Sequence, residues 1–366
     1  KENLREFYSQ FPLLENFKKQ VETKQNSFTL EHRKVLVKSL QLQYENVEVS
    51  EATQENIQSL TEENTFTVTT GHQLNLFTGP LYFLYKIISA INLAKELKET
   101  YPEYNFVPIY WMASEDHDFE EIKSFHSNGK TYTWDRKSKG PVGNLNTETL
   151  KNIFNENISI PDFFKNAYSS SSSLSEAVRK YMNYLFGEYG LITIDPNSKN
   201  LKKNISDIIV DDVVNNTIEK IEKSSDKVSD VYVRKINFFY QEPDLRERID
   251  KTDKYNVLST TLSFTEQEIK DRIKSSPELF SPNVITRCLY QQRILPNVCY
   301  LGGPAEIVYW ESFKKFFDNY NIPYPVLVPR DFALLLTAKV QNLIKKLKLS
   351  SIDLFDDKNK IENKVL

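Results

Sequence analysis

Residues 113–121, ASEDHDFEE, gather acidic side chains around one histidine. The charged members of this cluster are Glu115, Asp116, His117, Asp118, Glu120 and Glu121. Carboxylates in such a cluster can bind an ammonium group, position Mg²⁺ or act as a general base. Helix capping is the alternative, with Ser114 as the cap and the acids in a first turn that the helix dipole favours. Capping does not explain Asp-His-Asp directly after a buried strand. We therefore take Asp116, His117 and Asp118 as catalytic candidates, of which two point into a site, and Glu115 as a binding residue.

A second polar group lies in TFTVTTGHQLNLFTGP, residues 65–80, where a strand pattern gives way to a helix at Pro80. Its candidate binding residues are Gly71, His72, Gln73 and Asn75. Glycine lets the backbone turn and approach a ligand, and the free N–H groups of a helix start attract anions. His72 can bond a phosphate or act as an acid or base near neutral pH. The alternative is a plain strand-to-helix turn with a satisfied histidine.

The third group, LPNVCYLGGPAEIVYW at residues 295–310, repeats this strand, glycine turn and helix start. Its candidate binding residues are Gly302, Gly303 and Glu306, with Asn283 and Arg287 upstream. A second helix N-terminus facing the same crevice suits a nucleotide or an acidic substrate. Arg287 suits a carboxylate through a bidentate pair, although a surface salt bridge is the default for such a residue. A tight turn without a ligand is the alternative reading of the whole segment.

The elements that position these groups alternate along the chain. Buried strand patterns cover 65–70, 106–113, 191–196, 297–303 and 324–330, and helix patterns cover 80–98, 174–187 and 305–320. This order predicts an α/β fold with a Rossmann-like parallel sheet and insertions. Ligands of such sheets bind at the carboxyl ends of the strands, where all three polar groups fall.

The predicted domain organisation is a core interrupted twice. The expected parts are an N-terminal helical segment packing on the core (1–60), the Rossmann-like core (61–123, 170–225 and 290–336), a first insertion (124–169), a second insertion (226–289) and a Lys-rich helical tail (337–366).

Composition excludes several classes of protein. The 366 residues carry a formal net charge of −3, which argues against a general nucleic-acid binder. Cys288 and Cys299 lack a metal-like spacing and are expected to be free thiols in a reducing cytosol. No apolar run approaches the ~20 residues that span a bilayer, and the N-terminus lacks a signal-peptide pattern. We therefore expect a cytoplasmic protein without a membrane partner.

Five segments resemble the bacillithiol biosynthesis cysteine-adding enzyme family, BshC. They are TGHQLNLFTGPLYFLYKIISAINLAKEL, VPIYWMASEDHDFEEI, FGEYGLITIDP, FSPNVITRCLYQQRILPNVCYLGGPAEIVYW and PYPVLVPRD. The resemblance covers roughly 65–335. The family more often has Gln where this chain has His72, which favours a binding role over a catalytic imidazole. The family continues into a long α-helical coiled coil, and residues 337–366 are expected to be its truncated start.

The resemblance implies a core similar to class I aminoacyl-tRNA synthetases and nucleotidyltransferases, with connecting insertions. It implies a ligase that joins the carboxyl of L-cysteine to the amine of glucosaminyl-malate, the last step in making the low-molecular-weight thiol bacillithiol. The coiled coil implies a homodimer.

Amide formation requires a group that activates the carboxyl and side chains that bind each substrate. A carboxylate does not acylate an amine unaided, so ATP with Mg²⁺ is the expected co-substrate, held by the two helix N-termini. Asp116 and Asp118 can hold the ammonium or Mg²⁺, and Arg287 or Arg330 can bind the malate carboxylates. Zinc is another route to cysteine selection through its thiolate, but few histidines are present, so zinc is not expected. The sequence leaves the metal undetermined.

Two rival functions remain open on this fold, because fold does not fix reaction. One is a nucleotidyltransferase or metal-dependent hydrolase. The other is a non-catalytic dimeric scaffold.

Overall fold

The computed structural model describes residues 7–127, 129–154, 158–224 and 231–366. The chain divides into two units, residues 1–330 and residues 331–366, which are described separately.

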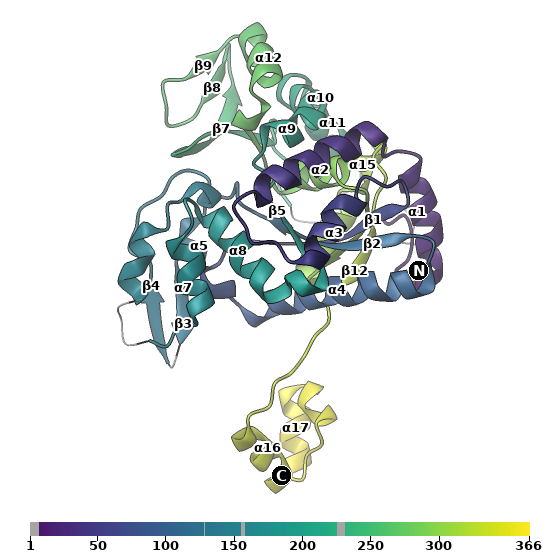
Figure 1. Cartoon of the computed structure of the whole chain (residues 1–366), viewed down its shortest axis with the longest axis vertical. Helices are drawn as coiled ribbons and strands as arrows, with labels where there is room; N and C mark the ends of the chain where they lie inside the picture. Colours follow the sequence, from purple (N-terminus) through teal and green to yellow (C-terminus); the bar gives the residue numbers. More distant parts are fainter. Residues whose placement is uncertain (1–6, 128, 155–157, 225–230) are drawn as a thin grey trace. The chain divides into compact units, whose positions relative to one another are not determined.

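The first unit is built on a parallel sheet whose strands, in the described part of the chain, follow the order β12-β11-β1-β2-β5 (Figure 1). The strands are β1 (Thr65–His72), β2 (Asn105–Met112), β5 (Ile192–Ile194), β11 (Asn297–Gly302) and β12 (Val326–Pro329). The predicted Rossmann-like α/β fold is confirmed. From β1 the chain adds β2 and then β5 on one side of the sheet, and later adds β11 and then β12 on the other side of β1. The switch point, where such sheets bind ligands, therefore lies between β1 and β11.

Polar side chains inside the sheet are paired where β1 meets β11. Asn297 accepts hydrogen bonds through its Oδ1 from the hydroxyls of Thr67 at 3.1 Å and Thr69 at 2.7 Å. All three residues are buried, so these bonds offset the cost of burying the two hydroxyls and the amide oxygen. These bonds explain how a strand rich in threonine occupies the centre of the sheet.

Helices cover both faces of the sheet. On one face, α1 (Phe17–Gln25) and α4 (Leu81–Thr100) bury apolar residues against Phe66 and Val68. On the other face, α2 (Leu30–Tyr44) and α3 (Glu51–Ser59) contribute to the core that contains Ile109. The other helices of the first unit are α5 (Phe119–Ile122), α6 (Lys151–Phe154), α7 (Asp162–Ser169), α8 (Leu174–Phe186), α9 (Lys199–Lys202), α10 (Ser206–Val210), α11 (Thr217–Lys223), α12 (Glu266–Ser275), α13 (Val284–Ile294), α14 (Pro304–Glu311) and α15 (Lys314–Asn319).

A second, antiparallel sheet lies between β5 and β11 in the sequence. Its strands, in the order β10-β6-β7-β8-β9, are β6 (Phe238–Glu242), β7 (Leu245–Lys251), β8 (Tyr255–Val257), β9 (Ser263–Phe264) and β10 (Phe280–Pro282). A separate hairpin, β3 (Ser124–Ser127) and β4 (Lys130–Thr133), follows α5. The second sheet shares a hydrophobic core with the first, since Phe238, Tyr240 and Phe280 pack with Trp111 and Ile194.

Two expected helices differ from the structure. The helix predicted over 305–320 is broken into α14 and α15 at Ser312 and Phe313, which lets Trp310, Phe316 and Phe317 all bury in one core. The tail predicted as one helix forms α16 (Ala338–Lys346), a 3-10 turn (Ile352–Phe355) and α17 (Lys358–Val365). Lys348 has a positive φ of 54°, which ends α16.

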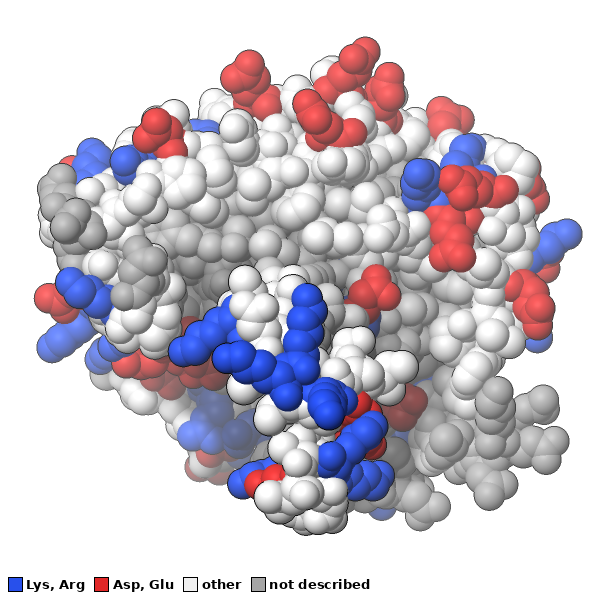
Figure 2. All heavy atoms as spheres, turned by 90° about the horizontal axis from the view of Figure 1, so that it is seen from below, with Lys and Arg blue, Asp and Glu red and all other residues white. Residues whose placement is uncertain are grey.

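Surface charge is mixed. Figure 2 shows charged side chains mostly toward the edges of the visible face, with several Asp and Glu along the upper edge and a denser group of Lys and Arg in the foreground. Among the described residues, no helix combines the length and the apolar character needed to cross a membrane.

Candidate active site

A crevice of about 450 Å³ lies at the carboxyl ends of β2 and β5, against the second sheet and the start of α13. Its lining residues are Trp111, Ala113, Glu115, Asp116, Pro196, Val231, Tyr232, Arg234, Phe239, Arg246, Pro282, Asn283, Val284 and Arg287. Four of these were candidates from the sequence: Glu115, Asp116, Asn283 and Arg287. The crevice therefore brings acids from the core together with arginines from elsewhere in the chain.

Arg246 on β7 is a crevice residue that sequence reasoning missed. It donates hydrogen bonds through Nε to the Ser281 hydroxyl at 2.9 Å and through Nη2 to the Pro282 carbonyl at 3.0 Å. Its guanidinium also stacks on the Phe239 ring, 3.9 Å from the ring centre. Burial lowers the pKa of Arg246, and the nearby Asp116 and Glu115 oppose that shift. An arginine in the segment LRERID gives no signal of its own, because exposed salt bridges are its usual role.

Asp116 is held in one orientation by several donors. Gln73 Nε2 donates to its Oδ2 at 2.9 Å, and the backbone N–H groups of His117 and Asp118 donate to its Oδ1 at 2.7 and 3.2 Å. Burial alone would raise the pKa of this carboxyl, but contacts with His117, Gln73 and Arg246 outweigh burial and hold its pKa well below the ordinary value. Asp116 is thus an anion at neutral pH. Gln73 also joins the 65–80 segment to the acidic cluster.

The capping alternative is correct for Glu120 and Glu121, which lie in the first turn of α5, and wrong for Ser114, because the cap is Asp118. Asp118, which is exposed, caps α5 by accepting a hydrogen bond from the Glu121 backbone N–H at 3.4 Å. Ser114 instead donates to Asp195 Oδ1 at 2.5 Å. The catalytic assignment of Asp118 stays a prediction, and the structure gives its carboxylate a capping contact.

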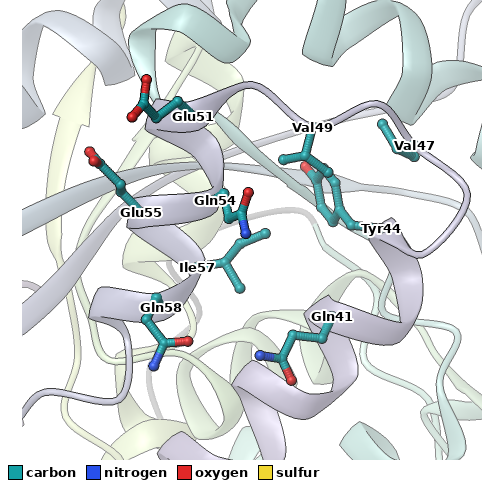
Figure 3. A pocket seen from close by; sticks show the side chains of 9 residues that line it. All are labelled: Gln41, Tyr44, Val47, Val49, Glu51, Gln54, Glu55, Ile57 and Gln58. Carbon is teal, nitrogen blue, oxygen red and sulfur yellow. The ribbon is translucent and has the colours of Figure 1, made fainter.

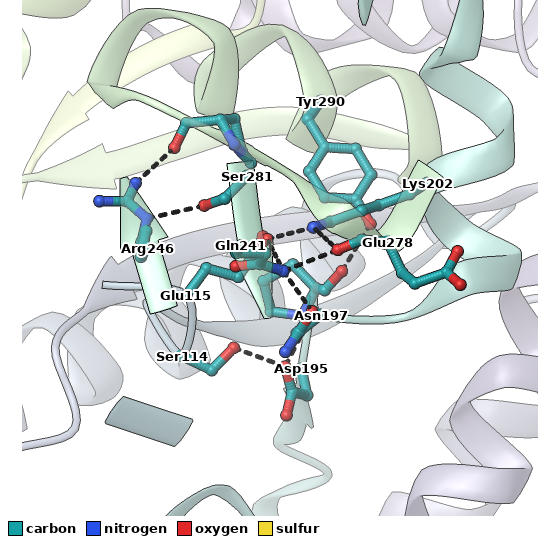
Figure 4. A network of polar contacts seen from close by, with 12 residues as sticks. Ser114, Glu115, Asp195, Asn197, Lys202, Gln241, Arg246, Glu278, Ser281 and Tyr290 are labelled. Carbon is teal, nitrogen blue, oxygen red and sulfur yellow. Dashed lines mark hydrogen bonds and ion pairs between the residues drawn. The ribbon is translucent and has the colours of Figure 1, made fainter. Parts of the chain in front are cut away.

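Glu115 belongs to a buried network that joins the two sheets (Figure 4). It forms an ion pair through Oε1 with Lys202 of α9, whose side chain is 0% exposed. Gln241 of β6 donates through Nε2 to the same oxygen at 3.2 Å, to Asn197 Oδ1 at 2.9 Å and to the Glu278 carbonyl at 2.8 Å. The network fixes Glu115 at the crevice and attaches β6 to the ends of β2 and β5.

The glycine turns meet at the switch point, beside the crevice. A side-chain Cβ at Gly71 would lie 3.4 Å from Nη1 of Arg287 and 3.3 Å from the Tyr300 hydroxyl, so glycine lets Arg287 approach the end of β1. Lys86 of α4 donates to the Gly71 carbonyl at 2.8 Å and forms an ion pair with Glu306.

The Glu306 carboxylate forms hydrogen bonds at the start of α14, the helix to which it belongs. It accepts hydrogen bonds from the Tyr300 hydroxyl at 2.7 Å and from the Gly303 N–H at 3.1 Å. A Cβ at Gly302 would lie 3.0 Å from the Cβ of Glu306, so glycine permits this close approach. Arg330 stacks over Tyr82 at 5.5 Å from the ring centre, next to Gly303.

None of the four candidates of the 65–80 segment lines the crevice. Gly71 and Gln73 lie next to its residues Arg287 and Asp116, and His72 and Asn75 have other surroundings. The His72 ring stacks on Phe83, with 4.7 Å between the ring centres, and burial together with Lys86 lowers its pKa to about 3. This imidazole is therefore neutral near pH 7, and its binding role stays a prediction. Asn75 lines a separate cavity of about 480 Å³ with Phe77 and Phe125. Phe77 and Thr78, which follow Asn75, have positive φ angles of 51° and 70° and make a tight turn before α4.

The expected cofactor can be compared with these residues. Of the two helix starts expected to hold the phosphates, that of α14 has its Gly303 N–H bonded by Glu306, whereas that of α4 has no side-chain cap. At the crevice itself, the Asn283 side chain bonds the N–H groups at the start of α13, so the arginines are the main anion-binding groups of its lining. Arg234, Arg246 and Arg287, with the rings of Tyr232 and Phe239, fit phosphates and a flat base. In the described part of the chain, no three His, Cys, Asp or Glu side chains converge as a metal site. Cys288 and Cys299 are free and buried, and burial raises the pKa of both thiols, that of Cys288 to about 12.

A larger hollow of about 630 Å³ lies between α2 and α3 (Figure 3). It is lined by Gln41, Tyr44, Val47, Val49, Glu51, Gln54, Glu55, Ile57 and Gln58. None of the three polar groups of the sequence contributes to it, and its lining has no cationic side chain. The smaller crevice is therefore the better candidate for a site that binds anions.

Comparison with known proteins shows the family of the chain. The family model described as "Bacillithiol biosynthesis BshC, N-terminal Rossmann-like domain" matches residues 1–331. A protein of Flavobacterium johnsoniae named "Putative cysteine ligase BshC" is 46% identical over 382 residues, covering 100% of this chain and 72% of the relative. Proteins of the same name from Flavobacterium psychrophilum and Bacillus cytotoxicus are 47% and 30% identical, covering 97% and 84% of this chain and 70% and 63% of those relatives. On this evidence the chain belongs to the BshC family of bacillithiol biosynthesis.

Proposed function

We propose that the crevice joins the carboxyl of L-cysteine to the amine of glucosaminyl-malate, as the last step of bacillithiol biosynthesis. The observation that carries this proposal is one cavity that holds the anion Asp116 together with Arg246 and Arg287. A ligase of an amino acid and an acidic aminosugar needs both signs of charge within one site. The family membership and the relatives' name support the same reaction.

The reaction needs an activated carboxyl group. A nucleoside triphosphate supplies the activation, because its phosphorus becomes bonded to one carboxyl oxygen of cysteine. That oxygen then leaves together with the phosphate. The amine nitrogen then attacks the carbonyl carbon, the C–O bond breaks with its electron pair going to the phosphate, and the amine loses a proton to solvent. Mg²⁺ is proposed as the counterion of the triphosphate.

The chain's own groups have separate roles in this proposal. Asp116 binds the cysteine ammonium, because it is ionised and fixed by Gln73. Arg287 binds a malate carboxylate, because it donates hydrogen bonds to the neutral groups Gln291 and Tyr309, at 3.4 and 3.3 Å, and keeps its charge for an anion. Arg330 is the alternative, from the end of β12. Packing of the second sheet against the strand ends limits the water that would hydrolyse the activated carboxyl.

We also propose a cytoplasmic homodimer. Two buried free thiols suit a reducing compartment. Val340, Leu343 and Leu347 of the second unit are exposed apolar residues at helical spacing, which supports a helical partner. Light scattering of the full-length protein tests the dimer: a monomer at micromolar concentration would contradict it.

The test of the reaction is product formation by the purified protein with cysteine, ATP and glucosaminyl-malate, followed by mass spectrometry. Asp116→Asn is expected to lower kcat/KM by about 10²-fold or more, because it removes the charge and nearly keeps the shape. Glu120→Gln is the matched control, since Glu120 belongs to the same cluster but is exposed and pairs with Lys123. Asp118→Asn separates capping from catalysis, because Asn also caps helices.

The rivals predict other products. ATP consumption or nucleotide transfer without an amide would favour the nucleotidyltransferase or hydrolase. A folded protein that binds neither ATP nor the substrates would favour the scaffold.

A further inference from the structure

The contact between Arg246 and His117 fixes the position of a proton. Arg246 Nη1 lies 2.9 Å from His117 Nδ1. A guanidinium has only N–H donors and no lone pair to accept with, so the arginine must donate and Nδ1 must accept. His117 is therefore a neutral imidazole whose hydrogen is on Nε2.

The surroundings hold this arrangement. Nε and Nη2 of Arg246 donate to Ser281 and Pro282, and its guanidinium lies on the Phe239 ring (Figure 4 shows Arg246 beside Ser281). The arginine therefore cannot turn away without losing several contacts. Asp116 Oδ1 is 3.7 Å from His117 Nδ1, too far for a hydrogen bond that would favour the other tautomer.

His117 lies at the rim of the crevice. Its ring is 6.0 Å from that of Phe239, and both Phe239 and Arg246 line the cavity. Its side chain is 45% exposed, so a ligand can reach the ring. Since Nδ1 is occupied and Nε2 already carries a hydrogen, this ring has no free lone pair with which to take a proton from the amine.

We propose that Arg246 is a positioning residue that fixes His117 as a neutral hydrogen-bond donor, and that His117 Nε2–H donates to the cysteine carbonyl oxygen as the amine attacks. The inference rests on the ligase reaction proposed above. That oxygen gains negative charge in the step, and one preorganised donor to such an oxygen contributes about 10²–10³-fold in kcat. His117 thus acts as a donor rather than as the general base.

The tautomer can be measured without any reaction. Two-bond ¹H–¹⁵N spectra of the ¹⁵N-labelled protein report which nitrogen of each of the four histidines carries hydrogen. His117→Gln identifies the His117 signals by their loss. We expect an unprotonated Nδ1 and a protonated Nε2 at neutral pH, and a mixture of tautomers in Arg246→Met. A matched control is Arg248→Met, which replaces an exposed arginine of the same strand. A wild-type Nδ1–H tautomer, an imidazolium, or an unchanged tautomer in Arg246→Met would overturn the proposal.

Kinetics then separate a donor from a base. Glutamine keeps a side-chain N–H, so His117→Gln is expected to keep kcat within about tenfold, while His117→Ala loses about 10²-fold in kcat with little change in KM. Equal losses in the two variants would refute the donor role. If the wild-type protein made no amide, the proposed function would fail, but the spectra would still test the tautomer that Arg246 imposes.

Discussion

Replacing Lys202 by methionine should destabilise the protein strongly, because it breaks a buried ion pair on one side only. Lys202 is completely buried, and its ammonium is bonded to Glu115 and to the Glu278 carbonyl, the latter at 3.2 Å. Methionine has a similar length and volume, so the packing change is small. The variant leaves the buried Glu115 carboxylate with Gln241 at 3.2 Å as its remaining donor.

The expected size follows from that geometry. Removing one partner of a buried ion pair usually lowers the free energy of unfolding by about 3–5 kcal/mol, because a charge remains without its counterion. Replacing both partners avoids that penalty. The double variant Glu115→Gln with Lys202→Met should therefore lie within about 1–2 kcal/mol of the wild type.

Urea unfolding followed by tryptophan fluorescence measures this difference, since Trp111 is buried at the crevice. Lys199→Met is the matched control on the same helix. Lys199 is 48% exposed and lies 3.4 Å from Glu278, so its replacement should change stability by less than about 1 kcal/mol. The stabilising role of the buried ion pair would be refuted if Lys202→Met lowered the free energy of unfolding no more than Lys199→Met does. It would also be refuted if the double variant were as unstable as Lys202→Met alone.

Two other perturbations test the site and its support. Gly71→Ala places a methyl group against the ends of Arg287 and Tyr300 and should lower kcat/KM by about tenfold, because Arg287 has to move. The free energy of unfolding in urea should change by less than about 1 kcal/mol. Unchanged kinetics would show that Arg287 is not part of the site. Burial raises the pKa of Asp212 to about 7 in the folded protein, whereas the pKa of an Asp in an unfolded chain is about 3.9. The contribution of Asp212 to stability is therefore fully present below about pH 4 and is lost as the pH rises through about 7. The stability of the wild type relative to Asp212→Asn should therefore fall between about pH 4 and 7 in unfolding measurements, and a flat difference would contradict the assigned burial.

The parallel sheet and the polar groups at its strand ends could be predicted because their signals are local. Continuous apolar runs such as that ending at Met112, followed by polar residues and a helix start, identify each strand without knowledge of its neighbours. Asp116 was placed at a strand end on that basis, Arg287 was expected to face the site from upstream of the last glycine turn, and both line the crevice.

The rest of the site depends on packing between distant segments. Lys202 stands in SKNLKKN, which resembles an exposed lysine run, and lysine is rarely buried unless it is paired. Arg246 becomes a crevice residue only because the second sheet packs on the strand ends. Asn75 was expected among the ligands, but it lines a separate cavity, next to a turn in which Phe77 and Thr78 have positive φ angles, and neither residue is a type that signals such a turn.

The central pairing of β1 with β11 also constrains how the chain can fold. Thr67 and its partner Asn297 are separated by 230 positions in the sequence. During synthesis, β1, α4 and β2 emerge long before the strand that completes the middle of the sheet. Contacts of such long sequence separation form slowly, because loop closure must precede them. The crevice, with Glu115 on one side and Arg287 on the other, is thus absent from a partly made chain, and substrates that bind it should stabilise only the completed fold.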